Sequence, residues 1–241
     1  MPPRTPPNRR PPAGSGNLLL DRLPAATSAA LRPHLQAIPL ELRLVLHEPL
    51  TPVEHVYFPT RGAVSTLALM EDGTGIEVGI TGTEGVVGLP ALLGVGRTPA
   101  RSLVQLPGEA LRVRAAVLRD EMERHAALRQ VLLRSAGAFH GQLALVAACN
   151  GLHSVGQRIC RWLLTTQDHA AADEFPVTHE FLAFMLGVRR SSVSEVARPL
   201  QQAGCIDYRR GRLRVLDRRG LECGACECYR RIREIHRDAL A

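Results

Sequence analysis

The chain has 241 residues, of which 45% are hydrophobic and 22% are charged, a composition typical of a globular protein with one large domain or two modest ones. No apolar run approaches the roughly 18 residues that a membrane span requires, and the first residues lack the apolar core of a signal peptide. We therefore expect a cytoplasmic protein without a membrane partner, in which six cysteines, all from Cys149 onward, form no disulfide framework.

The charge is distributed unevenly. All 30 basic residues are arginines, and the formal net charge is +7. Positions 17–157 are neutral in sum, whereas positions 189–219 hold nine arginines against three acidic residues. This basic segment predicts a polyanionic partner for the C-terminal part of the chain. Aromatic residues make up only 4%, too few for the stacking surfaces of single-strand binding, so the pattern favours a double-stranded partner.

The N-terminal region is predicted to contain little regular structure. Residues 1–16 are mainly proline, arginine and small residues, and we expect them to be disordered because they have little to bury. From Asn17 to Leu46 the pattern predicts short helical segments, interrupted by Pro24, Pro33 and Pro39. With the strands that follow, these segments would form a sensor domain over residues 17–125.

Between about residues 45 and 115 the hydrophobic pattern alternates. Short alternating runs such as 53–57, 76–80 and 101–106 are separated by Asp-Gly, Thr-Gly and Pro-Gly turns, which is typical of antiparallel strands. We therefore expect an α+β protein whose N-terminal part is a small antiparallel β-roll, similar to a jelly roll.

A long helix is predicted over residues 126–152. The residues that recur along it at spacings near 3.5 are Leu128, Leu132, Ser135, Phe139, Gln142, Val146 and Cys149. Two interpretations remain open: this stripe pairs with its copy in a dimer, or it packs on the β-roll. A second helix is predicted over about 154–166, and the polar stretch 168–174 is interpreted as the connection between domains.

Residues 178–202 carry the pattern that is most informative about function. Thr178 can cap a helix that runs to Leu186, Gly187 can form a left-handed turn, and a second helix begins near Arg190. The apolar residues and the small Ala183 have the spacing of a helix-turn-helix. The polar residues left on the outer face, where a DNA major groove would meet them, are Arg189, Arg190, Ser191, Ser194, Glu195 and Arg198.

A β-hairpin is predicted directly after this motif, placed like the wing of a winged helix within a DNA-binding domain over residues 153–241. Residues 206–208 and 213–215 alternate, and a basic turn joins them. Arginine side chains at such a tip suit phosphate contacts, which predicts that Arg209, Arg210 and Arg212 bind the DNA backbone. Pro199 would bend the last turn of the preceding helix without breaking the motif.

The chain resembles the Crp/Fnr family of bacterial transcription regulators. The resemblance is specific over VTHEFLAFMLGVRRSSVSEVARPLQQAGCIDYRRGRLRVLDRRGL, residues 177–221, and looser in the β-roll. It implies a β-roll of the cyclic-nucleotide-binding type, a long dimerisation helix and a winged helix-turn-helix. It also implies a homodimer on an inverted repeat of double-stranded DNA, and contact with RNA polymerase if the protein is an activator.

The resemblance implies roles for individual residues as well. The family's base-reading positions correspond to Arg190, Ser191, Ser194 and Glu195. Its phosphate-contacting positions correspond to Thr178, His179, Glu180 and Arg189, to which Arg198 is added from the outer face of the second helix. The family often has glutamate where Ser191 stands and arginine where Glu195 stands. We therefore expect a target sequence different from the best-known family sites.

Cyclic AMP is not expected to be the effector. Family members that bind it place a glutamate on the ribose hydroxyl and an Arg-Ser type pair on the cyclic phosphate. Here Leu89 stands in place of the glutamate, Glu84 comes too early, and Arg101 and Ser102 are slightly out of register. Arg101 and Ser102 are therefore only a weak effector site, and no cofactor is predicted.

The C-terminal cysteines form a separate pattern. Cys223, Cys226 and Cys228 could bind zinc with a fourth ligand such as His236, or respond to redox state. The favoured alternative is a short helix after the wing in which the cysteines are small buried groups, so no metal is predicted. An iron–sulfur cluster held by N-terminal cysteines is not expected, because no cysteine precedes Cys149.

A metal-dependent enzyme of the cupin type, with an accessory nucleic-acid-binding module, is the alternative from another functional class, since it uses a similar β-roll. His47, His55, His140 and His153 show no metal-ligand spacing, and the chain contains no P-loop, nucleophile elbow or His/Glu zinc motif. The sequence therefore predicts a DNA-binding regulator rather than an enzyme.

Overall fold

The computed structural model describes residues 14–241, so the predicted disorder of residues 1–16 lies outside the described residues at positions 1–13. The remaining residues of that segment are anchored. The backbone N–H of Ser15 donates to Asp21 Oδ1 at 2.6 Å. The buried Asn17 amide donates to the carbonyls of Pro59 and Gly85 at 2.9 and 3.0 Å, which joins the start of the described chain to the β-roll.

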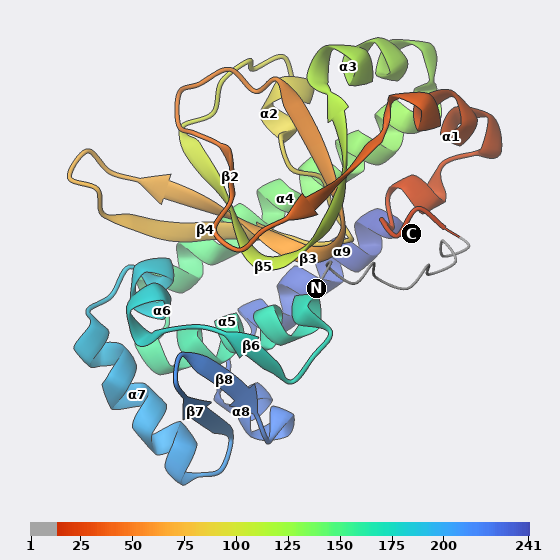
Figure 1. The fold of residues 1–241 in the computed structure, drawn as a ribbon. Helices are drawn as coiled ribbons and strands as arrows, with labels where there is room; N and C mark the ends of the chain where they lie inside the picture. The colour runs from red at the N-terminus through yellow and green to blue at the C-terminus, as the bar shows by residue number, and fades with distance from the viewer. Residues whose placement is uncertain (1–13) are drawn as a thin grey trace, which may run out of the picture.

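The N-terminal domain is an antiparallel sheet that curls into a roll (Figure 1). Its strands are β1 (Gln36–Leu40), β2 (Val45–His47), β3 (His55–Leu69), β4 (Gly75–Thr81) and β5 (Ala100–Arg114). Strand β5 pairs with β1, β2 and β3, and β4 lies beyond β3. The long strands β3 and β5 bend where their register shifts between Arg61 and Val64. Only glycine fits at this crossing, because a Cβ on Gly108 would lie 2.0 Å from the Arg61 carbonyl oxygen.

The prediction of helical segments over residues 17–46 is only partly correct. Helical turns are present as η1 (Leu20–Arg22), α1 (Ala25–Leu31) and η2 (Arg32–His34), but β1 and β2 occupy the rest, so the roll begins at Gln36 and not near residue 45. Pro39 pairs with Glu109 in the edge strand β1. An edge strand tolerates proline because it leaves some N–H positions unpaired, and the same proline ends any helix.

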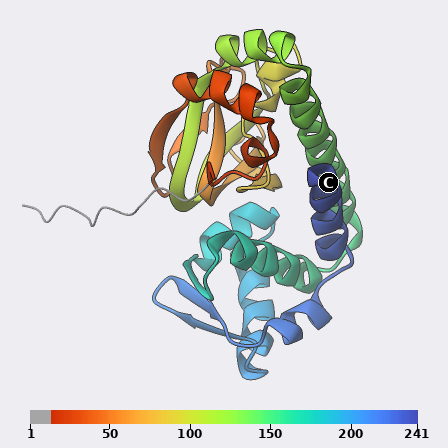
Figure 2. The same cartoon turned by 90° about the vertical axis from the view of Figure 1, so that its right-hand side faces the viewer.

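The next three helices along the chain are α2 (Leu89–Leu92), α3 (Ala115–Arg124) and α4 (Ala126–Leu152). Figure 2 shows α4 running along one side of the molecule from the roll to the C-terminal domain. The buried stripe of α4 contains Leu128, Leu132, Ser135, Ala138, Gln142, Val146 and Cys149. These side chains are covered within a single chain, in part by the roll, since Gln142 Nε2 donates to the Ile80 carbonyl at 3.1 Å. The interpretation that this stripe packs on the roll is therefore the one that holds.

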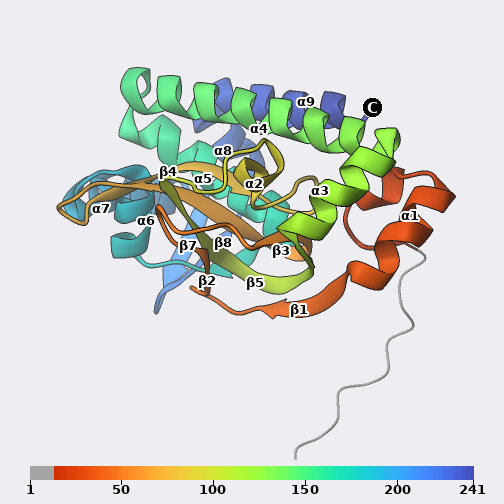
Figure 3. The same ribbon diagram turned by 90° about the horizontal axis from the view of Figure 1, so that it is seen from above.

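The last helix, α9 (Cys228–Leu240), lies alongside α4 (Figure 3). Its inward face contains Tyr229 and Ile232, which are buried, and Ile235. Gly141 of α4 allows the close approach, because a Cβ there would lie only 3.2 Å from the Ile235 side chain. The sequence pattern predicted only a short helix after the wing, whereas the structure has the short α8 and then the longer α9. The apolar spacing of Tyr229, Ile232 and Ile235 could have revealed it.

The other face of α4 is open. By length and composition it is the one helix within residues 14–241 that could cross a membrane, with a mean hydropathy of 1.3 over 18 residues of which 28% are buried. The average is high because leucine, valine and alanine are frequent, but Arg134, His140 and Gln142 interrupt the segment, so it contains no continuous apolar run of that length. The exposed or half-exposed stripe of α4 has heptad spacing and consists of Ala126, Gln130, Leu133, Gly137, His140, Ala144, Ala147 and Gly151. We call it the outer seam.

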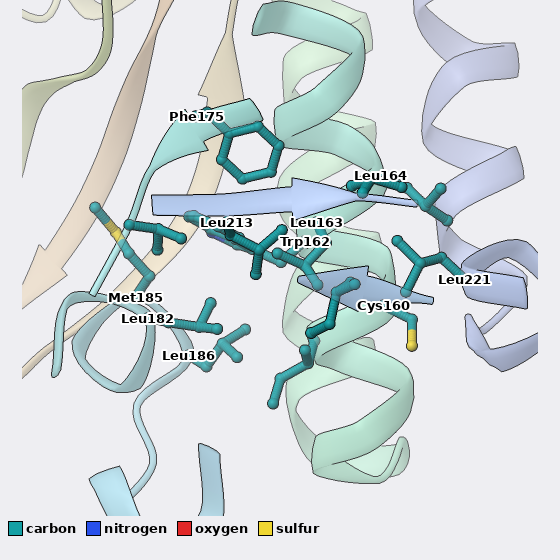
Figure 4. Packing of buried hydrophobic residues seen from close by; sticks show 14 of the residues in the cluster. Cys160, Trp162, Leu163, Leu164, Phe175, Leu182, Met185, Leu186, Leu213 and Leu221 are labelled. Carbon is teal, nitrogen blue, oxygen red and sulfur yellow. The ribbon is translucent and has the colours of Figure 1, made fainter. Parts of the chain in front are cut away.

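The C-terminal domain combines helices with a three-stranded sheet. Its elements are α5 (Val155–Ala170), β6 (Glu174–Pro176), α6 (His179–Leu186), α7 (Arg190–Gln202), β7 (Ile206–Arg209), β8 (Arg212–Val215) and α8 (Arg218–Gly224). Figure 4 shows its core, in which Trp162, Leu163 and Phe175 pack between α5 and the sheet. The same core continues to Ala63 and Leu67 of the roll, so the two domains pack directly on each other.

The interdomain connection lies elsewhere than predicted. Helix α5 continues to Ala170 and β6 begins at Glu174, so the polar stretch 168–174 is an internal part of the C-terminal domain. Its polar side chains are paired, as in the hydrogen bond from Tyr229 Oη to Asp168 Oδ2 at 2.7 Å. The chain passes from α4 to α5 at His153 and Ser154, where Ser154 forms a capping box with Gln157.

Candidate nucleic-acid interface

The helix-turn-helix forms for the local reasons that its sequence predicts. Thr178 Oγ1 accepts a hydrogen bond from the Phe181 backbone N–H at 3.1 Å and so caps α6. Gly187 ends α6 in the left-handed conformation with φ of 60°. Helix α7 then starts at Arg190 and continues past Pro199 to Gln202. The motif is therefore intact despite the proline.

A small apolar wedge holds α6 against α7. Leu182, Ala183 and Leu186 of α6 and Val193 of α7 are buried, and Val193 is fully inaccessible to solvent. The small Ala183 side chain lets the two helices cross closely, as the motif requires. The opposite face of α7 is consequently free of the protein core.

The four predicted base-reading residues, Arg190, Ser191, Ser194 and Glu195, are all exposed on that face of α7. The Ser194 hydroxyl is also used within the domain: it donates to the Arg190 carbonyl at 3.2 Å and lies 3.0 Å from His179 Nδ1. A base contact from Ser194 would compete with these bonds. The side chains of Arg190, Ser191 and Glu195 have no partner among residues 14–241, so they are available to a ligand.

His179, predicted to contact phosphate, also connects three elements. Its ring stacks on Tyr208 of β7 with centroids 4.5 Å apart, and its Nδ1 atom faces Ser194 of α7. Burial, and then the charge of Arg190, lower the pKa of His179. A neutral ring contributes little to phosphate binding. The position of His179 favours a role in holding the wing and both helices in register.

The remaining predicted phosphate contacts fall into two groups. Arg189, Arg198 and Arg210 are exposed, and their side chains are unpaired within the described part of the chain. Arg209 lies 3.1 Å from Asp207, and Arg212 contacts Glu174. Thr178 and Glu180 are exposed at the start of α6, where the Glu180 carboxylate would repel a phosphate. The free arginines are thus the stronger candidates for backbone contacts.

The tip of the wing is a tight two-residue turn. Arg210 and Gly211 both have positive φ, 50° and 77°, as expected for the type of hairpin turn that matches the twist of the strands. Glycine takes this conformation at little cost, whereas Arg210 does so less readily. The Arg210 side chain is exposed at this turn.

An acidic residue that sequence analysis missed lies on the wing. Glu174 of β6 accepts hydrogen bonds from Arg212 and from Arg214, the latter at 2.7 Å. These two bonds, that of Arg212 first, lower the pKa of Glu174, so the carboxylate is charged near neutral pH. Glu174 therefore offsets part of the positive charge that the hairpin would present to DNA.

Replacing this carboxylate should strengthen binding to any duplex. We expect Glu174→Gln to raise the affinity for an unrelated duplex about 3- to 10-fold at 0.1 M salt and to steepen the salt dependence by about one ion, because two arginines are released. Glu234→Gln is the matched control, since it removes an acid that is likewise paired with an arginine, but from α9 and not from the sheet that contains the wing. Fluorescence anisotropy at several salt concentrations measures both effects. An equal gain in the two variants would contradict a local role for Glu174.

The predicted effector residues do not come together as an anion site. Arg101 forms an exposed ion pair with Glu48 at 2.9 Å. Ser102 is buried and hydrogen-bonded to His47 Nδ1 at 3.2 Å. Leu89 is buried at the start of α2 and presents no carboxylate for a ribose. The polar groups of Arg101 and Ser102 are thus already satisfied by neighbours in the roll.

A cavity of about 1280 Å³ lies instead between the roll, α5 and α9. Glu84 of the roll and His169 of α5 lie on its wall, with Glu84 Oε1 and His169 Nε2 3.2 Å apart. Burial would lower the pKa of His169, but the Glu84 charge outweighs it and raises that pKa to about 9. Burial would likewise raise the pKa of Glu84, but the His169 charge brings it to about 2. The two groups form a largely buried ion pair between the domains.

The predicted cysteine cluster is rearranged in the structure. Cys223 is exposed, and His236 Nε2 lies 2.6 Å from Gln142 Oε1 in the cavity, away from the thiols. Cys226 and Cys228 are buried beside Cys149 and His153, which come from the end of α4. The histidines alone show no metal-ligand spacing, but His153 follows Cys149 by four residues at the C-cap of α4, and its ring lies beside the thiols.

Comparison with known proteins agrees with the architecture. Residues 157–223 match the family described as the Crp-like helix-turn-helix domain. No curated protein matches the chain. Among solved structures, a protein assigned to the Crp/Fnr family of transcriptional regulators from Eubacterium rectale superposes with a TM-score of 0.69 at 17% identity, covering 85% of this chain and 96% of that one.

Two further structures have similar folds. FixK2 from Bradyrhizobium japonicum superposes with a TM-score of 0.68 at 16% identity, covering 80% of this chain and 98% of its own. TTHB099, a transcriptional regulator of the CRP family from Thermus thermophilus, gives 0.64 at 21% identity, covering 78% of this chain and 96% of its own. These identities are low, so the likeness concerns the fold alone, over 78–85% of this chain.

Proposed function

We propose that this chain, which has the fold of Crp/Fnr transcriptional regulators and a Crp-like helix-turn-helix domain, binds an inverted-repeat operator as a homodimer in the cytoplasm. The observation that carries this proposal is the open face of α7. Arg190 and its exposed neighbours face solvent beside a wing whose tip carries Arg210. An α-helix with such a face fits the major groove, and the wing tip then reaches the phosphate backbone.

The outer seam of α4 supports the homodimer. Its side chains are mostly small or apolar, they follow a heptad repeat over the length of the helix, and nothing within residues 14–241 covers Gly137 or Gly151. A second copy of the same helix would cover the seam in a two-helix coiled coil. Two α7 helices would then read half-sites about one helical turn apart, roughly 34 Å.

This role requires no catalytic activity and no organic cofactor. Binding to RNA polymerase would follow only if the operator lies where an activator acts. Gel shifts with genomic fragments, followed by footprinting, test the central statement. A protected inverted repeat is expected. Absence of duplex binding above background at moderate salt, or binding of a monomer to a single half-site, would contradict it.

Two arginine variants separate base reading from phosphate binding. Arg190→Ala should cost about 1–3 kcal/mol on the operator and relax the preference at one base position, because a bidentate base contact is lost. Arg210→Ala should weaken binding to all sequences alike and reduce the salt slope by about one ion. Competition anisotropy against operators randomised at single positions measures both. Identical behaviour of the two variants would rule out the assigned roles.

Cyclic AMP should not regulate this protein. A ribose hydroxyl that meets the apolar Leu89 loses about 1–3 kcal/mol of hydrogen bonding, and Arg101 is already paired with Glu48. Calorimetry with cyclic AMP and cyclic GMP should therefore show no binding in the micromolar range. Gel shifts with each nucleotide should match the shift without it. A micromolar dissociation constant with a parallel gain in operator affinity would contradict this expectation.

A further inference from the structure

The junction between α4 and the C-terminal domain holds a compact group of metal-binding side chains. Cys149 and His153 lie at the end of α4, and Cys226 and Cys228 lie on either side of Glu227 at the start of α9. The thiols are buried, with exposed fractions of 0%, 5% and 3% for Cys149, Cys226 and Cys228. We propose that these four residues form a structural zinc site that joins α9 to the end of α4.

The distances between the donor atoms fit one tetrahedral ion. All four donor atoms lie within 4.8 Å of one another. The Sγ atoms of Cys149 and Cys226 are 3.5 Å apart, and Cys228 Sγ lies 3.7 Å from His153 Nδ1. Bond lengths of about 2.3 Å to sulfur and 2.0 Å to nitrogen separate tetrahedral ligands by roughly 3.5–3.8 Å. The set therefore suits a single ion with three cysteines and one histidine.

The surroundings of the ligands support the same assignment. His153 Nε2 lies 3.3 Å from a Glu227 carboxylate oxygen, which orients the ring and leaves Nδ1 facing the thiols. A carboxylate on the far nitrogen is the usual second partner of a zinc-bound histidine. Three thiolates, a neutral histidine and Zn²⁺ carry one net negative charge. The buried Arg158, near the start of α5 and so next to this junction, has an Nε atom without a partner among residues 14–241, and its guanidinium can balance that charge.

Simple burial of small side chains does not explain this arrangement. Cys160 and Cys205 are also buried, yet neither belongs to the four-donor group. Cys149 and His153 lie more than seventy positions before Cys226 and Cys228, yet the four side chains meet. In addition, the second ring nitrogen of His153 faces the Glu227 carboxylate. Convergence of four soft or borderline ligands is what zinc selects over magnesium or calcium.

The zinc ion would connect two segments of the chain at the junction between α4 and the C-terminal domain. Zinc binding converts three thiols to thiolates and releases their three protons to solvent, with no change of oxidation state. The bonds would fix the start of α9 to the point where α4 leads into α5, and so restrict the orientation of the helix-turn-helix relative to α4. Removal of the metal should loosen this junction before it unfolds either domain.

Metal content provides the first test. Tag-free wild-type protein, purified under reducing conditions and refilled with Zn²⁺, should contain one zinc per chain by inductively coupled plasma mass spectrometry. Cys228→Ser and Cys226→Ser should each retain less than a tenth of that amount. Cys223→Ser, exposed and outside the group, and Cys205→Ser, buried and outside the group, should retain all of it. These measurements need no DNA, so failed operator binding would not affect them.

A second measurement does not depend on the variants folding. Cobalt(II) added to metal-free wild-type protein should produce the intense visible bands of a tetrahedral thiolate site, and Zn²⁺ should bleach them. The melting temperature of the wild type should fall with a chelator and return with Zn²⁺ but not with Mg²⁺. The proposal is overturned by a wild type that takes up no zinc, by unchanged zinc in Cys228→Ser, by iron in place of zinc, or by a Cys149–Cys226 disulfide in the reduced preparation.

Discussion

Leu133→Arg should convert the protein to a monomer and reduce operator affinity at least 100-fold. Leu133 is 49% exposed in the N-terminal half of the outer seam and is the largest apolar side chain there. In a two-helix coiled coil the substitution would place a charge from each copy in a desolvated position, which costs several kcal/mol without a partner. Loss of the dimer then removes one of two half-site contacts, since each monomer reads only one half-site.

Light scattering after size exclusion and gel shifts on the operator measure the two effects together. Leu50→Arg is the matched control, because Leu50 is even more exposed, at 67%, but belongs to the loop between β2 and β3. It should remain a dimer with unchanged affinity. If Leu133→Arg stays dimeric at the concentrations used for DNA binding, the copies associate through another surface.

His169→Gln should remove the pH dependence of stability that the Glu84–His169 pair creates. The folded-state pKa of His169 is about 9, above its ordinary value of 6.5, so its contribution is complete below pH 6.5 and is lost as the pH rises through 9. Glu84 has its pKa lowered to about 2, so its contribution is present above pH 4.5 and is lost in acid. The pair therefore stabilises most between about pH 4.5 and 6.5.

The expected size of this effect is large. At one pKa unit per 1.4 kcal/mol, the His169 shift corresponds to a contribution on the order of 3 kcal/mol near pH 6. Urea unfolding should show the wild type losing most of this amount between pH 7 and 9.5, with little loss in His169→Gln. Glu77 also titrates near this range, because burial raises its pKa to about 7 and the His169 charge opposes that rise, so the two proteins are compared in a Glu77→Gln background.

A double-mutant cycle tests whether Glu84 is the partner of His169. The variant Glu84→Gln with His169→Gln should be at least as stable as His169→Gln alone, because the single change leaves the Glu84 charge without its counter-ion in a site of low exposure. Equal pH profiles for wild type and His169→Gln would show that the pair does not carry the pH dependence.

The DNA-binding motif was predictable because its information is local. The Thr178 cap, the Gly187 turn and the apolar spacing from Leu182 to Val193 act within about twenty residues, and the structure forms α6 and α7 at those positions. The wing was predictable for the same reason, since a short turn with Gly211 fixes the hairpin. The strand at residues 36–40 was not predictable, because these residues become a strand only through pairing with β5.

Long-range contacts determined the remaining features. Periodicity identified the buried stripe of α4. The structure shows that α9 and the roll cover this stripe, so the outer seam is the face of α4 that stays free for a partner. The Glu84–His169 pair joins residues of two domains that no spacing rule connects.

The sequence by itself therefore determined the elements of this protein whose causes lie within one or two turns of chain: the cap, the turn, the wing and the periodic helix. Only the tertiary structure decided which distant side chains meet. In the folded chain, Cys223 and His236 lie apart from Cys226 and Cys228, whereas Cys149 and His153 lie beside them. The reason is physical: local hydrogen bonding and periodicity act over short chain distances, whereas the neighbours of a buried side chain depend on how whole elements pack.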